Sequence, residues 1–235
     1  MSYKAILFDM DGTLLPMDND EFTRCYFGYL IRAVGHFGYN KDNLIPAMWK
    51  GVEAMVRNNG SVTVDTRFWE VFESLFGKEV YDQIPTFDAF YRADFHKVKA
   101  VTQPTPLSKR AVTAARNAAE KVVVATNPLF PAVAIEARLS WVDLFPEDFD
   151  LVTTYENSHF CKPNPKYYLE ICQKLGVDPK DCLMIGNNTR EDMWAAAQTG
   201  MDTYLVTDCL IAEGECPECK SGTLAELCEF LEGLN

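Results

Sequence analysis

The stretch AILFDMDGTLLPMD, residues 5–18, decides the fold because it joins a buried-strand pattern to a pair of carboxylates. The apolar run 5–9 ends in Asp9, and Asp11 follows after one intervening residue. Alternate residues of a strand point to the same side, so both carboxylates are expected to face one small space. Two carboxylates held close are unfavourable unless a cation or a shared proton relieves them. The pair predicts either a divalent cation such as Mg²⁺ or a nucleophile beside a proton-cycling acid.

Further short apolar runs have the composition of parallel strands that are buried on both faces. They are KVVVAT (121–126), DLVTTY (150–155), CLMIG (182–186) and TYLVT (203–207). Helical periodicity over 164–176 and 190–200 ends at a glycine in both cases, and Thr223 with Glu226 fits the capping box of a last helix. This alternation predicts an α/β fold with a doubly wound, mainly parallel Rossmann-like sheet.

The segment 16–102 differs from the rest of the chain in its pattern. It is dense in aromatic residues, as in FTRCYFGYLIRAVGHFGY and FWEVFESLF, its periodicity is helical, and strand signals do not recur in it. We expect an all-helical domain inserted after the first strand, between core segments 1–15 and 103–235. Most of its aromatic side chains are expected to form its own core, with one or two facing a pocket.

Polar side chains follow the later strands at the edge of the sheet where ligands bind in open α/β folds. Thr126 and Asn127 offer a neutral ledge for an anion, and Lys162 stands before a proline and a helix start. Asp192 lies in the first turn of the next helix. Each has an ordinary alternative: a strand-end hydroxyl, a solvated lysine, and a carboxylate favoured by the helix dipole. Their order along successive strand ends favours a shared site.

The charge of the chain limits its partners. The 235 residues carry a formal net charge of −12. Nucleic acids and anionic membranes would repel such a surface, so neither is an expected partner. No apolar run reaches the ~18 residues that span a bilayer, and no signal peptide is visible, so a cytoplasmic location is expected.

The eight cysteines are scattered, and only Cys216 and Cys219 have CxxC spacing. With Cys209 and Cys228 they would supply four zinc ligands, but the spacing matches no common zinc pattern and a second CxxC is missing. A loop with incidental thiols between the last strand and the last helix is the favoured interpretation, and zinc remains the alternative.

Four motifs resemble those of the haloacid dehalogenase superfamily, in its capped phosphatase branch: FDMDGTL (8–14), VVVATN (122–127), FCKPNP (160–165) and LMIGNNTRED (183–192). The resemblance covers residues 1–15 and about 110–235, and the helical insertion matches the position of a cap domain. It implies that Asp9 attacks phosphorus, Asp11 cycles a proton, Thr126 binds the phosphoryl group, and Lys162 holds Asp9 and the phosphate together. Gly12, Thr13 and Asn127 are expected to contact the substrate.

The resemblance also implies Mg²⁺, bound by the Asp9 carboxylate, the Asp11 backbone carbonyl and the loop that ends in Asp192. The chain departs from the family pattern here, because amides stand at Asn187 and Asn188 where an aspartate is usual. An amide oxygen coordinates Mg²⁺ without contributing charge, so weaker Mg²⁺ binding is expected. The spacing to Asp192 allows either amide to be the ligand.

The expected function is Mg²⁺-dependent hydrolysis of a small phosphorylated metabolite through an aspartyl-phosphate. A dehalogenase needs neither the metal nor the acid at Asp11, whereas a phosphomutase fits the same motifs. The paired amides also motivate a non-catalytic binding or regulatory protein on the same scaffold. Against it stand four retained residues, Asp9, Asp11, Thr126 and Lys162. The sequence identifies neither the substrate nor the oligomeric state.

Overall fold

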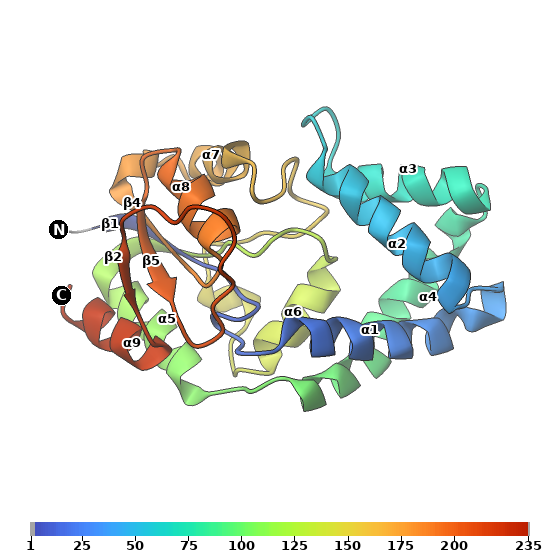
Figure 1. Cartoon of the computed structure of the whole chain (residues 1–235), viewed down its shortest axis with the longest axis horizontal. Helices are drawn as coiled ribbons and strands as arrows, with labels where there is room; N and C mark the ends of the chain where they lie inside the picture. The colour runs from blue at the N-terminus through green and yellow to red at the C-terminus, as the bar shows by residue number, and fades with distance from the viewer. Residues whose placement is uncertain (1–2, 235) are drawn as a thin grey trace.

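The computed structural model describes residues 3–234, which form a six-stranded parallel sheet and a separate group of helices (Figure 1). The strand order is β3-β2-β1-β4-β5-β6, with all neighbours parallel. The strands are β1 (Tyr3–Phe8), β2 (Ala119–Val124), β3 (Leu151–Val152), β4 (Cys182–Gly186), β5 (Asp202–Val206) and β6 (Lys220–Gly222). The predicted parallel α/β architecture is confirmed.

Helices cover both faces of the sheet because the central strands are apolar on both sides. In β1, Ile6 and Phe8 pack into one hydrophobic cluster, whereas Ala5 and Leu7 pack into the other. The first cluster includes α5 (Pro106–Ala118), α6 (Ala132–Ser140) and α9 (Leu224–Glu232). The second includes α7 (Pro165–Leu175) and α8 (Ala195–Ala197). The sheet is therefore wound on both faces, as the sequence predicts.

The chain leaves the sheet after β1 and builds the inserted helices before it returns through α5. These are α1 (Asn19–Val34), α2 (Lys41–Val56), α3 (Val64–Phe76), α4 (Val80–Arg92) and the 3-10 segments η1 (Gly35–Phe37) and η2 (Asp94–Val101). The outgoing and returning segments pair through a bridge between Met17 and Thr102 and a 2.8 Å bond from the Gln103 amide to the Pro16 carbonyl. We propose residues 16–102 as the cap.

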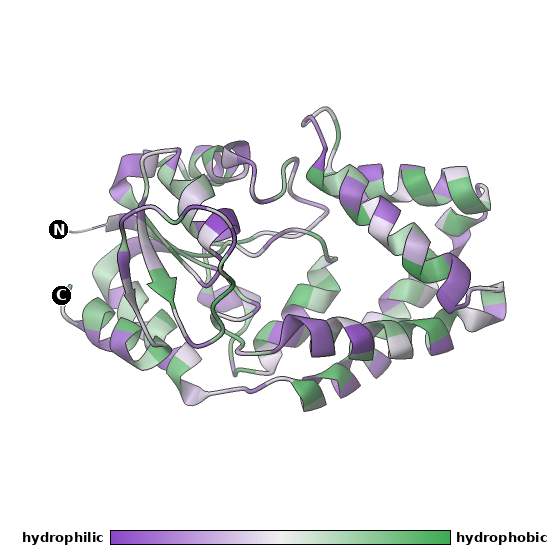
Figure 2. Cartoon of the chain, viewed as in Figure 1, coloured by the Kyte–Doolittle hydropathy of each residue, from purple (hydrophilic) through white to green (hydrophobic). Residues whose placement is uncertain are grey.

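Aromatic side chains fill the interior of the cap. Tyr26, Phe68, Trp69 and Phe72 are buried there, whereas Trp49 on α2 is 53% exposed. The helices of the cap alternate between hydrophobic and hydrophilic residues along their length, whereas the central strands are mostly hydrophobic (Figure 2). Within the described range, no helix is both long and apolar enough to cross a membrane.

Two elements that the sequence predicts within the core have a different local structure. The third strand is limited to Leu151–Val152, because the Asn157 side chain bonds to the Thr154 amide and the Val152 carbonyl and turns the chain away. The predicted helix 190–200 begins instead as a π-helix, Thr189–Trp194, followed by α8. The remaining 3-10 turns are η3 (Pro146–Asp148) and η4 (Pro179–Asp181).

A sixth strand, β6, lies between the last predicted strand and the final helix. The sequence predicts only a loop there. The strand consists of Lys220, Ser221 and Gly222 and has no apolar residue, so it carries no hydrophobic signal. It pairs with β5 at the edge of the sheet, where polar residues remain in solvent.

Candidate active site

A buried lysine joins two carboxylates at the carboxyl ends of the central strands. Lys162 is 1% exposed, and its Nζ donates to Asp9 Oδ1 at 2.7 Å and to Asp192 Oδ1 at 2.6 Å. Burial lowers the pKa of Lys162, but Asp192 and Asp9 outweigh burial and hold this pKa well above its ordinary value. Asp192, together with Asp9 when it is ionised, therefore keeps the amine charged.

Asp9 follows β1 directly and has an unusual electrostatic environment. Burial raises the pKa of Asp9 to about 8, with a further increase from Asp192 and an opposing effect from Lys162. The single positive charge of Lys162 is shared between two acids, so it does not fully compensate the burial of Asp9. A further cation beside Asp9 would favour its ionised, nucleophilic form.

The turn after Asp9 requires a glycine. Gly12 has φ +86°, and a Cβ there would lie 2.2 Å from Asn187 Nδ2. The Asn187 amide lies against this turn and accepts a bond from Thr13 Oγ1 at 3.2 Å. Gly12 and Thr13, predicted to contact substrate, are not among the described residues that line the cavity. Their observed contacts are with Asn187, and their role toward substrate stays a prediction.

Asp11 faces a second cation that the sequence analysis missed. Arg138 on α6 is fully buried, and its Nη1 donates to Asp11 Oδ2. Its guanidinium lies 4.4 Å from the centre of the Phe130 ring. The signal was a lone arginine within the apolar run AVAIEARLSWV (132–142), because arginine is almost never fully buried without a partner. Asp11 Oδ1 has no hydrogen-bond partner among the described residues.

Thr126 and Asn127 follow β2 and line the same cavity as Asp9 and Asp11. Asn127 Nδ2 donates to Glu191 Oε2 at 3.1 Å, and its Oδ1 accepts from the Lys162 amide at 3.2 Å. Burial raises the pKa of Glu191. The loops after β2, β3 and β4 are thus tied together around Asn127.

The structure separates the two amides that the sequence left equivalent. Asn188 Oδ1 accepts the backbone amides of Arg190 and Glu191, both at 2.9 Å, and so caps the π-helix. Asn187 Nδ2 lies nearest the turn at Gly12 and donates to the Cys209 carbonyl at 2.6 Å, whereas Asn187 Oδ1 accepts only from Thr13 among the described residues. Asn187 is therefore better placed than Asn188 to offer an oxygen to a cation.

Asp192 is already satisfied by protein groups. Its Oδ2 accepts the amides of Asn187 and Asn188 at 3.1 and 2.9 Å, and its Oδ1 accepts Lys162. The residues nevertheless fit a hard cation, because all the available donors are oxygens and the buried Asp11 Oδ1 lacks a partner. No three acidic, histidine or cysteine side chains cluster in a metal-binding arrangement anywhere in residues 3–234, including around Cys216 and Cys219.

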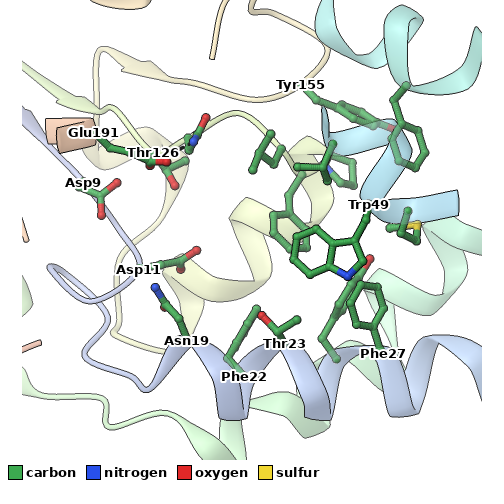
Figure 3. A pocket seen from close by; sticks show the side chains of 18 of the residues that line it. Asp9, Asp11, Asn19, Phe22, Thr23, Phe27, Trp49, Thr126, Tyr155 and Glu191 are labelled. Atoms are coloured by element: carbon green, nitrogen blue, oxygen red, sulfur yellow. Dashed lines mark hydrogen bonds between the residues drawn. The ribbon is translucent and has the colours of Figure 1, made fainter. Parts of the chain in front are cut away.

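The side chains of Asp9, Asp11, Thr126 and Glu191 line one end of a cavity of about 380 Å³ (Figure 3). Cap helices α1 to α4 form the opposite end, where Trp49 projects toward the carboxylates (Figure 3). The cavity thus lies between the sheet edge and the cap, and a ligand in it would contact both.

Comparison with known proteins places the chain among hydrolases. A family model described as haloacid dehalogenase-like hydrolase matches residues 3–200. A glyceraldehyde 3-phosphate phosphatase of Methanothermobacter thermautotrophicus is 25% identical over 205 residues, 86% of this chain and 85% of the relative. A pyrimidine 5′-nucleotidase of Streptococcus pneumoniae is 28% identical over 212 residues, 86% of this chain and 83% of the relative.

Solved structures share the fold over nearly the whole chain. A phosphatase from Thermococcus onnurineus superposes with a TM-score of 0.61 at 21% identity, covering 98% of both chains. A 2-haloacid dehalogenase from Pseudomonas syringae gives 0.67 at 16% identity, covering 99% of this chain and 100% of the other. Together with the family match, this confirms the resemblance seen in the four motifs: the chain belongs to the haloacid dehalogenase-like hydrolase family.

Proposed function

We propose that this protein is a Mg²⁺-dependent phosphatase that hydrolyses a small phosphate monoester through an aspartyl-phosphate on Asp9. The supporting observation is the joint placement of Asp9 and Asp11 on one cavity, with Lys162 bonded to Asp9 and Arg138 bonded to Asp11. The relatives named as a glyceraldehyde 3-phosphate phosphatase and a pyrimidine 5′-nucleotidase support the same reaction class. The cavity of about 380 Å³ supports a small substrate.

In the proposed reaction, an Asp9 oxygen attacks phosphorus and the bond from phosphorus to the substrate oxygen breaks. Asp11 donates its proton to that departing oxygen, so the alcohol leaves neutral. Asp11 then accepts a proton from a water molecule whose oxygen attacks the phosphorus of the aspartyl-phosphate, which restores Asp9 and releases phosphate. Lys162 compensates negative charge at Asp9, and Thr126 positions the phosphoryl oxygens.

Asp9, Asn187 and the Asp11 backbone carbonyl would hold the Mg²⁺ ion. When bound, the ion supplies positive charge that neutralises the phosphoryl oxygens. The side-chain oxygens of Asn188 and Asp192 already accept hydrogen bonds from the protein. Asn188 caps the π-helix, and Asp192 accepts from Lys162 and from two backbone amides. We therefore assign the amide ligand to Asn187.

Phosphate release from 4-nitrophenyl phosphate with Mg²⁺ tests the reaction. Asp9→Asn should lower kcat/KM by at least about 10³-fold, because the nucleophile is lost. Glu136→Gln is a matched control, since Glu136 is exposed on the same helix as Arg138. Equal release by wild type and Asp9→Asn would contradict the proposal.

Two variants test whether Asn187 or Asn188 is the amide ligand of Mg²⁺. Asn187→Asp should tighten Mg²⁺ binding by roughly tenfold or more, because a ligand charge is added beside the ion. Asn188→Asp should leave the affinity nearly unchanged, because position 188 caps the π-helix. Calorimetric titration of Mg²⁺ into each protein measures both, and the assignment is wrong if only Asn188→Asp tightens binding.

A further inference from the structure

The cavity has two ends of opposite character. Carboxylate and amide groups line the end at the sheet edge, whereas large apolar and aromatic side chains from the cap line the other, including Phe27, Trp49, Phe68 and Tyr91. Ligand sites with this pattern fix a polar group with a few side chains and bury the rest of the ligand against apolar surface. The phosphoryl group belongs at the polar end, so the alcohol part of the ester must lie among the aromatic side chains.

The charges around the cavity limit what that alcohol part carries. No lysine, arginine or histidine is among the described residues that line the cavity, and Asp88 adds a carboxylate at the cap end. The buried cations nearby, Lys162 and Arg138, form ion pairs with Asp9, Asp192 and Asp11. Arg138 Nη2 has no hydrogen-bond partner among the described residues, but Arg138 is fully buried and does not line the cavity. A second phosphate or carboxylate on the substrate would therefore lose its hydration without gaining a cation.

Trp49 gives the apolar end a specific contact. Most of the cap aromatics are buried, but Trp49 is 53% exposed, and its indole projects into the cavity (Figure 3). Phe27 supports it edge-on, with ring centroids 6.0 Å apart. A supported indole directed at the reacting carboxylates presents an apolar surface to a ring of the substrate, and aromatic pairs contribute beyond the area they bury.

We infer that the substrate is an aryl or arylalkyl phosphate monoester without a second negative charge. This inference rests on the proposed function, since it places the phosphoryl group at Asp9. A benzyl phosphate would put its phosphoryl group beside Asp9 and its ring beside Trp49. A phosphoglycolate would put a carboxylate into the same apolar end.

The test compares benzyl phosphate with phosphoglycolate as substrates in the presence of Mg²⁺. The wild type should favour benzyl phosphate by at least about 30-fold in kcat/KM, as expected for burial of an aromatic ring. Trp49→Ala should reduce this preference by about tenfold, mainly through KM for benzyl phosphate. Phe37→Ala is the matched control, because Phe37 is an exposed aromatic residue on the cap that does not line the cavity.

A second measurement separates this inference from the proposed function. Titrations with benzylphosphonate and phosphonoacetate, which are not hydrolysed, follow binding through tryptophan fluorescence. Selective binding of benzylphosphonate without Asp9-dependent hydrolysis would contradict the proposed function and support the ligand class. Asp9-dependent hydrolysis with equal or reversed preference, or a preference unchanged in Trp49→Ala, would overturn the ligand class alone.

Discussion

Arg138 shows how one side chain connects the fold to the chemistry. It is fully buried, bonds to Asp11 and lies over the ring of Phe130. A buried charge is tolerated only when it is paired, so Arg138 and Asp11 depend on each other. The pair orients the acid that the proposed reaction needs while leaving Asp11 Oδ1 without a partner among the described residues.

Removing Arg138 should therefore affect both stability and turnover. Arg138→Leu leaves the Asp11 carboxylate without its cation, and we expect a loss of about 3 kcal/mol in the free energy of unfolding. Urea unfolding followed by circular dichroism measures this loss. Arg110→Leu, which breaks an exposed pair with Glu232, should cost far less than Arg138→Leu, because solvent screens an exposed pair. Similar losses in both variants would contradict the role of the buried pair.

Asp9 should make the stability of the metal-free protein depend on pH. Its pKa is raised from 3.8 to about 8, chiefly by burial, so the folded state binds a proton that the unfolded state releases. Stability from this group is present at low pH and is lost as pH rises from about 4 to about 8.

The neutral variant Asp9→Asn lacks this dependence. Its melting temperature relative to wild type should rise steadily between these pH values when both proteins are measured with a chelator. A constant difference in melting temperature between the two proteins across this pH range would show that Asp9 is ionised in the folded protein at every pH tested.

At the scale of elements, the close contact between α2 and α3 requires a glycine, Gly51, because a larger residue does not fit there. Gly51 lies in α2, and a Cβ there would lie 2.5 Å from the Phe68 ring of α3. Phe68 in turn stacks on Phe72, with centroids 4.6 Å apart. The two helices therefore approach closely at Gly51, where the cap forms its aromatic core.

Alanine at two helical glycines should have opposite effects. Gly51→Ala should destabilise the protein by about 1–3 kcal/mol, because the core would be overpacked. Gly28→Ala in α1 meets nothing within 4 Å, so it should stabilise by about 0.5–1 kcal/mol through helix propensity. Thermal unfolding of both variants checks the signs, and stabilisation by Gly51→Ala would refute the close packing.

What the sequence predicts depends on whether an element carries an apolar signal. The continuous apolar run CLMIG predicts β4, and every one of its residues is buried in the structure. The polar residues of β6 carry no such signal, so its pairing with β5 is seen only in the structure. The site follows the same rule: strand ends locate Asp9, Thr126 and Lys162, but Arg138 comes from a helix interior. Side-chain hydrogen bonds of Asn188 and Asp192 to the backbone accompany the π-helix, and hydrophobic periodicity does not reveal such bonds.

At the scale of the whole molecule, the cap contacts the core at a point away from its linkers. The amides of Val64 and Asp65 donate to the carbonyls of Ser158 and Tyr155 at 2.9 and 3.1 Å, and Asn58 Nδ2 donates to the His159 carbonyl at 2.9 Å. These bonds cross from the start of α3 to the loop that leads to Lys162. The segment that leads into α3 is thereby tied to the loop that carries the catalytic lysine candidate.

Loosening this contact should be visible without any substrate. Asn58→Ala should speed amide exchange at Val64 and Asp65 by about fivefold, because a hydrogen bond contributes roughly 1 kcal/mol. Asn59→Ala is the control, since Asn59 is exposed and its side chain bonds within its own loop. Hydrogen exchange read by NMR gives both rates, and unchanged exchange in Asn58→Ala would mean that the contact does not hold the cap.

The central claim is that Asp9 is the nucleophile, and trapping the covalent intermediate tests it most directly. Acetyl phosphate suits the test because its leaving acetate needs no proton, so Asp11→Asn should still be phosphorylated but should hydrolyse slowly. After an acid quench, mass spectrometry of peptides from Asp11→Asn should find the phosphoryl group on Asp9. The Asp9→Asn variant should carry none. A phosphoryl group on another residue, or equal labelling in Asp9→Asn, would contradict the account.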